Sequence, residues 1–259
     1  MPDFNFGAVL QGRYLDWLIA GACKTLLLFF AAWISGFLIG LLVVSLRESR
    51  ARPLELLAKA FVGYHRNVPG LVQVFIWYFG VPQILPEAWQ AWINDHGSEF
   101  FLVWIALSLN AGAYMSEDLR SGVRSLPPTQ LEAARALGMT FVQAMRVVIL
   151  PQALRVALPP LTNQSLGLFK STSLAMAIGF AEMTYAAHQV ENESFRTFET
   201  FAIASVFYWA GSFLLMWLGH ACSVKLKAGR AARRSKSFAT MASCSWSDSF
   251  RTVRWEALP

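Results

Sequence analysis

The sequence predicts an all-α membrane protein that crosses the bilayer five times. Hydrophobic residues make up 55% of the 259 positions, charged residues make up only 15%, and there are ten Trp and twenty Phe. A soluble domain of this size would need more charge to cover its surface. Five apolar segments are long enough to cross a hydrocarbon core of about 30 Å at about 1.5 Å per residue. These segments are 21–46, 68–85, 100–116, 156–181 and 200–224.

Basic residues alternate between successive connections, and this alternation predicts the orientation. The first connection carries Arg47, Arg50 and Arg52, the third carries five arginines, and the segment after the last span opens with a basic run. The second connection, 86–99, has no Lys or Arg, and the fourth has one arginine, Arg196, against glutamates that include Glu191, Glu193 and Glu199. Because basic connections stay in the cytoplasm, we expect the N-terminus outside and the C-terminus inside.

The chain divides into three predicted parts. Residues 1–17 are polar and mixed in charge, without the pattern of a signal peptide, and are expected outside the membrane. Residues 18–227 form the membrane domain, and 228–259 form a basic, then Ser-rich tail that is expected to be flexible. Aromatic residues gather around the second connection, as in the belt at a membrane–water interface. They are Trp77, Tyr78, Trp89, Trp92 and Trp104.

The sequence lacks the residue patterns that are typical of nucleic-acid-binding proteins, metalloproteins and nucleotide-binding proteins. The formal charge of +6 is placed beside apolar spans and forms no aromatic-interleaved patch, so nucleic-acid binding is not expected. The cysteines and histidines have neither disulfide-framework nor metal-ligand spacing. Residues 167–171 superficially resemble a phosphate-binding loop, but they lack the glycine before Lys170 and lie in an apolar helix. We expect no nucleotide, cofactor or metal site in this chain, and no catalytic constellation.

The third connection predicts two short helices joined by a sharp bend. Thr129-x-x-Glu132 and Thr140-x-x-Gln143 fit the capping box, in which two side chains satisfy free amides at a helix start. Gly138 lies where the first helix should end, because glycine tolerates the left-handed backbone conformation. Alanines keep the first helix thin, so it could enter a groove on a partner. Pro151 is expected to limit the second helix before the chain re-enters the membrane.

The spacing of this connection resembles the EAA loop of membrane subunits of bacterial ABC importers. Residues 132–138 read EAARALG, and nine residues later come Val148, where the family usually has isoleucine, and Ile149-Leu150-Pro151. The alternative for Glu132 alone is a capping role, and alanines are common in any helix. Further motifs look like permeases for polar amino acids. They are Arg66-Asn67-Val68-Pro69, Leu71-Val72-Gln73, Arg124-Ser125-Leu126-Pro127, Leu150-Pro151-Gln152-Ala153, Leu158-Pro159-Pro160-Leu161 and Lys170-Ser171-Thr172-Ser173-Leu174.

The resemblance runs from about Tyr14 to Lys227, and within the subgroup it is closest to glutamate/aspartate uptake permeases. The motifs that carry this are Asn5-Phe6-Gly7, Tyr14-Leu15-Asp16-Trp17-Leu18 and Trp77-Tyr78-Phe79. Permeases for glutamine or histidine are the alternatives. The tail after about Ala231 departs from the family, whose members usually end soon after the basic stretch.

The resemblance implies a type I ABC importer fold, with five transmembrane helices and a cytoplasmic coupling-helix loop. The chain would lie in a bacterial inner membrane, surrounded by lipid, beside a second permease subunit that is identical or paralogous. ATP would be hydrolysed by separate cytoplasmic subunits, and a periplasmic binding protein would deliver the amino acid, so this chain would be no enzyme. Residues implied in coupling to the ATPase are Glu132, Ala133, Ala134 and Gly138.

Polar residues within apolar spans predict part of a translocation path. Lys170 lies near the middle of the fourth predicted span, where a charge costs about 2.5–3.5 kcal/mol. Asn163 precedes it by seven residues and therefore shares its helical face. The alternative for Lys170 is a contact with helix carbonyls or a partner subunit, and the alternative for Arg66 is a snorkelling interface arginine. The path candidates are Lys170, Asn163, Thr172, Ser173, Arg66 and Asn67.

An ion channel or an ATP-independent secondary transporter is the competing class. Coupling to an ion in such a protein would require an Asp or Glu within a membrane span. Apart from flanking positions such as Glu117, the five predicted spans contain no Asp or Glu. The sequence therefore favours an ATP-driven permease.

Overall fold

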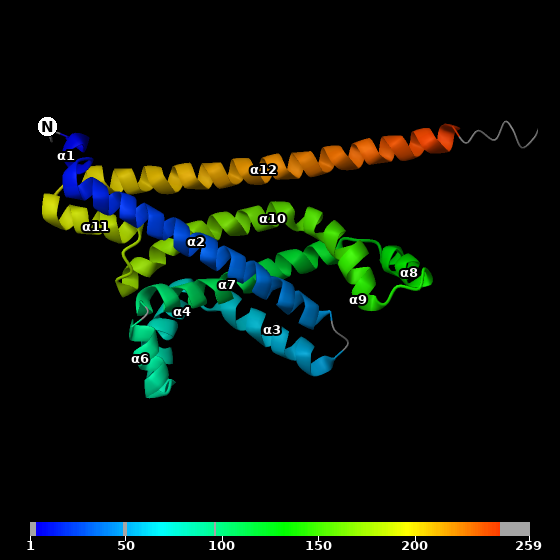
Figure 1. Ribbon diagram of the computed structural model, residues 1–259, viewed down its shortest axis with the longest axis horizontal. Coiled ribbons are helices and arrows are strands. Elements are labelled where there is room, and N and C mark those ends of the chain that lie inside the picture. Colours follow the sequence, from blue (N-terminus) through cyan, green and yellow to red (C-terminus); the bar gives the residue numbers. More distant parts are fainter. Residues whose placement is uncertain (1–3, 49–50, 96, 244–259) are drawn as a thin grey trace, which may run out of the picture. The chain divides into compact units, whose positions relative to one another are not determined.

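The structure is a computed structural model that describes residues 4–48, 51–95 and 97–243. Within these ranges every regular element is helical, which confirms the all-α prediction (Figure 1). The chain divides into two compact units, Met1–Gly219 and His220–Pro259. The first unit carries every residue of the candidate site. In its described part, the second unit is the continuation of the last helix.

The helices follow one another with short connections. In chain order they are α1 (Phe6–Val9), α2 (Gly12–Arg47), α3 (Arg52–Asn67), α4 (Gly70–Phe75), α5 (Val81–Ile84), α6 (Glu87–Asp95), α7 (Ser98–Arg124), α8 (Pro128–Ala136), α9 (Phe141–Ala144), α10 (Leu150–Ser171), α11 (Met183–Ser194) and α12 (Thr197–Ser243). Three further elements have other hydrogen-bond patterns. They are the π-helices η1 (Ile76–Gly80) and η2 (Met145–Ile149) and the 3₁₀-helix η3 (Thr172–Ile178).

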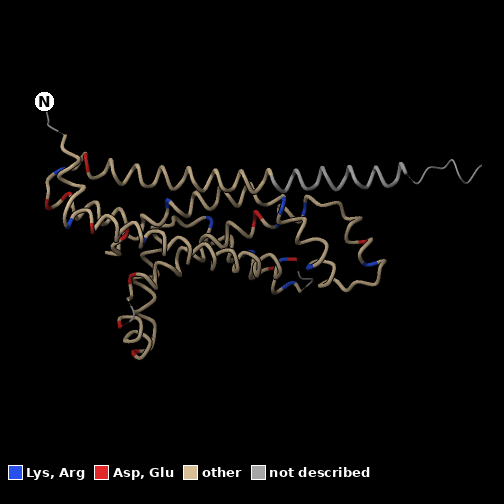
Figure 2. Tube along the Cα trace, turned by 45° about the horizontal axis from the view of Figure 1, so that its top comes forward, with Lys and Arg blue, Asp and Glu red and all other residues tan. Residues whose placement is uncertain are grey.

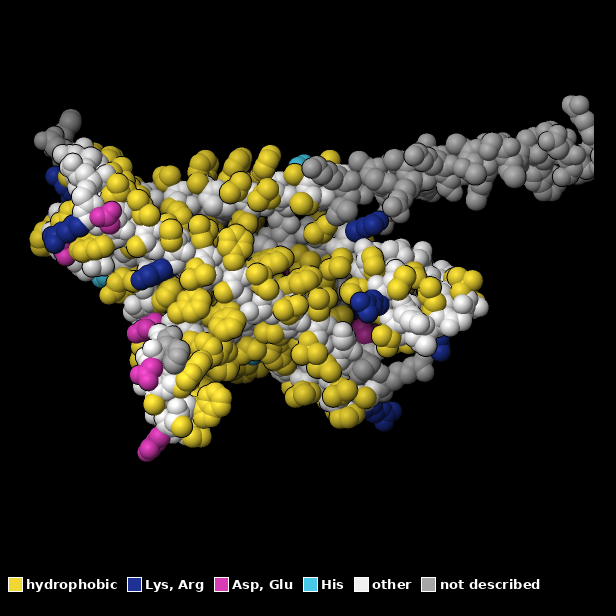
Figure 3. Space-filling view, viewed as in Figure 1, with side chains coloured by type: hydrophobic (Ala, Val, Ile, Leu, Met, Phe, Trp, Pro, Cys, Tyr) yellow, Lys and Arg dark blue, Asp and Glu magenta, His cyan; other side chains and the backbone are white. Residues whose placement is uncertain are grey.

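Four helical stretches in the described part are long and apolar enough to cross a membrane. They are Gly12–Arg47, Ser98–Arg124, Phe141–Ile178 and Thr197–Val224. Hydrophobic side chains cover much of the visible surface over these helices (Figure 3). Such a surface suits lipid, because a soluble monomer rarely exposes a large contiguous apolar patch.

The second predicted span differs from the expectation. The apolar helix there, Gly70–Ile84, has fewer than 18 residues and does not qualify as a crossing by itself. It follows α3 across a break at Val68 and Pro69, because proline disfavours helical backbone at the residue before it. A crossing at this place therefore has to be built from two helical pieces, and the total of five crossings stays a prediction.

The core forms where α2 packs against α7 through small residues. A Cβ atom added at Gly112 would lie 2.6 Å from Ile39 Cγ2, and one added at Gly36 would lie 3.0 Å from Ala111 Cβ. Glycine thus lets the two backbones approach closely, as small residues do between membrane helices. Around this contact Leu28, Val103 and Phe169 are fully or almost fully buried.

Pro151 does not limit the helix as predicted. A π-helical turn, η2, precedes it, and the helix continues through it into α10. The amide of Leu150 donates to Met145 O, one residue further back than in an α-helix. The same device precedes Pro82, where the amide of Val81 donates to Ile76 O. The wider turn absorbs the missing amide and the bulk of each proline ring.

The last helix continues into the predicted tail. α12 is helical through Ser243, whereas irregular chain was expected from about Phe238. The rest of the Ser-rich tail, 244–259, lies outside the described residues.

Candidate coupling loop and substrate path

The bend of the predicted coupling loop forms as the sequence indicates. α8 ends at Ala136, and Gly138 has φ +82°, in the left-handed region. The amide of Met139 donates to Ala134 O at 3.2 Å, and the amide of Gly138 donates to Arg135 O at 3.0 Å. These two bonds are the Schellman pattern that closes a helix end.

Only the second of the two predicted capping boxes exists. The amide of Gln143 donates to Thr140 Oγ1 at 3.3 Å, and the amide of Thr140 donates to Gln143 Oε1 at 2.9 Å. The first box was wrong, because α8 begins at Pro128 and its N-cap, Pro127, makes no side-chain bond. Proline is pre-organised for the first helical turn and has no amide to cap. Glu132 therefore has no capping role, and its exposed side chain makes no hydrogen bond or ion pair with the described residues.

The loop presents an apolar surface beside a groove. Leu137 is 82% exposed and Val142 is 70% exposed, which is unusual for large aliphatic side chains. Leu137 is part of the lining of a groove of about 450 Å³, to which the buried Ala134 and the exposed Ala133 also contribute. The whole lining is Thr129, Gln130, Ala133, Ala134, Leu137, Met139 and Val148. Exposed apolar side chains around a concave surface are typical of a protein–protein interface.

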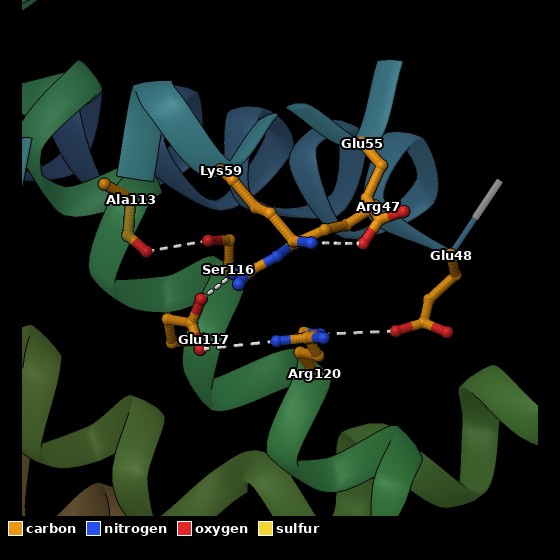
Figure 4. A network of polar contacts seen from close by, with 8 residues as sticks. All are labelled: Arg47, Glu48, Glu55, Lys59, Ala113, Ser116, Glu117 and Arg120. Atoms are coloured by element: carbon orange, nitrogen blue, oxygen red, sulfur yellow. Dashed lines mark hydrogen bonds and ion pairs between the residues drawn. The ribbon is translucent and has the colours of Figure 1, made fainter. Parts of the chain in front are cut away.

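A network of ion pairs joins the adjoining ends of α2 and α7 (Figure 4). The guanidinium of Arg47 pairs with the carboxylate of Glu117, and Arg120 Nε lies 3.3 Å from Glu48 Oε1. The arginine side chains are largely buried, so removing one partner would leave a costly unpaired charge. Glu48 also lines a cavity of about 170 Å³ with Phe141 of the loop, so the network borders the loop. Our sequence reasoning noted Glu117 only as a flanking acid.

Buried polar side chains hold the break between α3 and α4. The side-chain amide of Gln73 donates to His65 O at 2.9 Å and to Val68 O at 2.8 Å. Gln73 Oε1 therefore accepts at 2.7 Å from His65 Nδ1, and Asn110 Nδ2 adds a bond to His65 O at 3.0 Å. Carbonyl groups freed by the break thus find partners inside the protein, as a low-dielectric environment requires.

The predicted path residues Arg66 and Asn67 stand beside this break and are exposed. The Arg66 guanidinium lies over the Tyr114 ring, 5.4 Å from its centroid, and forms no ion pair with a described residue. The Asn67 side chain instead donates to Gly63 O at 2.6 Å. Arg66 is therefore exposed but rests against an aromatic ring, whereas the Asn67 side chain bonds to its own helix.

Lys170 and Asn163 share one exposed face of α10, as the seven-residue spacing predicts. Lys170 is not in the middle of a continuous helix, however, because α10 ends at Ser171 and a 3₁₀-helix follows. Its side chain makes no ion pair with a described residue. The 3₁₀-helix that follows Ser171 lies close to the break before α4, since a Cβ atom at Gly70 would lie 3.4 Å from Leu174 Cδ1.

The two hydroxyl candidates beside Lys170 behave differently. Thr172 is fully buried and donates to Phe169 O at 2.7 Å, so it faces the core and not a path. Ser173 is half-buried and donates to Lys170 O at 2.8 Å. Both hydroxyls thus satisfy carbonyls at the helix end, which is a common use of Ser and Thr in membrane helices.

The sequence reasoning missed a buried carboxylate between the last two predicted spans. Glu182 is fully buried and caps α11, accepting from the amides of Thr184 and Tyr185 at 2.9 Å each. Tyr208 of α12 donates to it at 2.7 Å. Burial raises the pKa of this carboxyl, while the bonds it accepts act in the opposite direction. Its position just after an apolar segment and before a helix start was the available signal.

Comparison with known proteins decides the family. The family model described as "Binding-protein-dependent transport system inner membrane component" matches residues 7–227. The chain belongs to this family. The permease is 36% identical over 216 residues to the glutamate/aspartate import permease protein GltJ of Escherichia coli (strain K12), with 80% of this chain and 88% of GltJ covered. It is 38% identical over 209 residues to the probable amino-acid ABC transporter permease protein PatM of Vibrio harveyi, with the same two coverages.

Among solved structures, the permease is similar to a chain described as "Crystal structure of an amino acid ABC transporter with histidines". The TM-score is 0.74 at 31% identity, and the match covers 86% of this chain and 99% of that one. Relatives named for glutamine, nopaline and arginine transport also match. The protein is thus a membrane-embedded, multi-pass permease of the amino-acid ABC importer family, and the predicted type I importer fold is confirmed.

Proposed function

We propose that this permease is the membrane subunit of an ATP-driven importer of polar amino acids, with glutamate and aspartate as its substrates. The 36% identity to GltJ supports this choice of substrate. Glutamine is the alternative that a second observation favours, because a permease named for glutamine is 32% identical over 204 residues. Histidine is a further alternative, from the motifs that polar amino-acid permeases share.

The apolar surface of the loop supports the proposal that a cytoplasmic ATPase docks there. Leu137 and Val142 are too exposed to stabilise this chain alone, and the adjoining groove offers a concave contact. Glu132 adds a charge that has no ion-pair partner among the described residues. The ion pairs at the ends of α2 and α7 border the loop. Through them, a movement of the loop would be transmitted to the membrane helices.

The exposed polar groups of the two helix breaks support a path at the contact with a second permease subunit. Lys170, Asn163 and Arg66 would be costly against lipid, whereas a water-filled path or a partner accommodates them. A periplasmic binding protein would deliver the amino acid from the side of the N-terminus, and the basic connections would lie in the cytoplasm. ATP would be bound and hydrolysed by the partner subunit.

Co-purification tests the docking surface. Leu137→Asp places a charge in the proposed interface and should strongly reduce the yield of ATPase that purifies with the permease. Ile84→Asp is the matched control, because Ile84 is equally exposed at 82% but lies in α5, away from the loop. Undiminished ATPase with Leu137→Asp would contradict the docking site.

Competition tests the substrate. Uptake of labelled L-glutamate by cells that depend on this importer should be inhibited by unlabelled glutamate and aspartate. Stronger inhibition by glutamine or histidine would replace the acidic substrates with that amino acid.

A further inference from the structure

The helix α6 stands apart from the bundle. It runs crosswise to α2 and α7, near the end of the first unit where α1 and α11 lie (Figure 1). Its own attachments include the buried Ile93, a ring contact of Trp92 with Phe101 at 5.5 Å, and the bond from Gln90 Nε2 to Leu85 O at 2.8 Å. An isolated helix of this length is not stable in water. Ile93 is the only buried residue of α6, so most of the surface of this helix is exposed.

The residues of α6 separate into two faces. At about 100° per residue, Ala88, Trp89, Trp92 and Ile93 fall within one arc of about 140°. Glu87, Gln90, Asn94 and Asp95 fall within the opposite arc. In the space-filling view, acidic side chains lie along one side of α6 and hydrophobic side chains along the other (Figure 3).

The part of the apolar face that Ala88, Trp89 and Trp92 form is exposed. Trp89 is 60% exposed and Trp92 is 44% exposed, and together with Ala88 they line a shallow hollow of about 360 Å³. Tryptophan is the side chain that favours the region between lipid headgroups and acyl chains, because its ring is apolar and its N–H is polar. The hollow is apolar and open on one side, which suits the end of an acyl chain.

The charges on α6 fit the same placement. The described residues of α6 include acidic residues and no Lys or Arg (Figure 2). The acidic face is turned toward the end of the bundle where α1 and α11 lie (Figures 1 and 3). That end carries the connections beyond the long helices, where carboxylates would meet water if the tryptophans were turned toward the membrane.

We propose that α6 is an interfacial helix that lies in the plane of the membrane, with Trp89 and Trp92 inserted among lipids. The occupant of the apolar face is lipid in general, because α6 has no basic residue that would select anionic headgroups. The inference needs only a membrane protein of this fold, and it holds whatever the permease transports.

Spin labelling tests the placement of each face. Single cysteines replace Trp89, Trp92, Glu87 or Asn94 in a permease whose Cys23, Cys222 and Cys244 are changed to Ser, and the labelled protein is reconstituted in phosphatidylcholine vesicles. Labels at 89 and 92 should collide several-fold more with oxygen, which partitions into lipid, than with a water-soluble nickel chelate. Labels at 87 and 94 should show the reverse. Leu27, an exposed residue of α2, provides the lipid reference.

Other occupants of the face give different results. Labels at 89 and 92 that are accessible to the nickel chelate would place α6 in water, where a binding protein could reach it. Labels shielded from both reagents would mean that a protein surface, such as a second permease subunit, covers the face. A requirement for phosphatidylglycerol would indicate headgroup attraction. Each of these results overturns the proposal.

A second measurement keeps the native tryptophans. Lipids brominated close to the headgroup should quench more fluorescence in the wild-type permease than in the variant with Trp89→Phe and Trp92→Phe. Trp209→Phe removes an exposed tryptophan of α12 and is the control for loss of one fluorophore in a span. Equal shallow quenching of the wild type and the double variant would contradict the inference.

Discussion

Gly138 holds the bend of the proposed coupling loop in a backbone conformation that few other residues adopt. Its φ is +82°, and no atom lies within 4 Å of the position that a Cβ would take. The cost of a larger side chain is therefore conformational, about 1–2 kcal/mol for an L-residue in the left-handed region, and not a matter of crowding. A larger side chain at this position would change the angle between the two helices of the loop, and with it the surface that we propose the ATPase contacts.

We predict that Gly138→Leu leaves the amount of permease in the membrane unchanged and reduces the ATPase that purifies with it. Gly138→Asn is the control, because asparagine tolerates the left-handed conformation better than other residues. Full ATPase association with Gly138→Leu would show that the bend does not matter for docking.

Substitution of Lys170 tests whether its charge contacts the substrate. Its charge is exposed on α10 without an ion pair in the described part of the chain. If it meets a substrate carboxylate, Lys170→Met should lower uptake while assembly and ATP turnover persist, and Lys170→Arg should retain part of the uptake. Lys24→Met, at an exposed lysine of α2, should transport normally. Unchanged glutamate and aspartate uptake by Lys170→Met would assign the residue a structural role.

At the scale of elements, Glu182 connects the start of α11 to α12 through Tyr208. A hydrogen bond to a charged group contributes about 1.5–3 kcal/mol, so Tyr208→Phe should lower the thermal stability of the purified permease at neutral pH. Tyr185→Phe is the control, because only the backbone amide of Tyr185 is bonded to Glu182. Equal stability of the two variants would contradict the role of the hydroxyl.

The effect of Tyr208→Phe should depend on pH. Because burial raises the pKa of the Glu182 carboxyl, the folded state binds the proton more tightly than the unfolded state. The cost of ionising Glu182 is therefore present above the raised pKa and disappears as the pH falls below it. The neutral carboxyl is a weaker acceptor, so the stability difference between Tyr208→Phe and the wild type should shrink in acid. A difference that grows in acid would contradict this sign.

Connections between the helices test the orientation. In a permease without native cysteines, single cysteines at Asn94 and Asn192 should react with an impermeant thiol reagent in intact cells. A cysteine at Ser125 should react only after lysis. All three positions are exposed, so differences in labelling report the side of the membrane. The reverse pattern would overturn the positive-inside assignment.

Local signals predicted the bend of the proposed coupling loop and its second capping box, because both depend on neighbouring residues, but the first capping box and the limit at Pro151 were wrong. Thr140 and Gln143 cap each other across three positions, and Gly138 closes the helix just before them. The break before α4 and the burial of Thr172 depend on contacts that sequence spacing does not reveal. Gln73 and Asn110, for example, meet at one carbonyl from two different helices.

On the scale of the whole molecule, the apolar periodicity was sufficient for the fold class but not for the continuity of the spans. The second predicted span, 68–85, begins at the break at Pro69, and the fourth changes from an α-helix to a 3₁₀-helix after Ser171. Hydropathy averages over such interruptions, so it places a crossing without resolving its parts. These two places lie close together, because a Cβ atom at Gly70 would lie 3.4 Å from Leu174 Cδ1.

The most direct test of the proposed function is uptake of labelled L-glutamate into proteoliposomes that contain the permease, its permease partner and its ATPase. Our account predicts uptake only when ATP is present on the ATPase side and loaded binding protein on the other. It also predicts that Leu137→Asp abolishes this uptake while the permease remains in the membrane. Uptake that proceeds without ATP, driven by an ion gradient, would contradict the account.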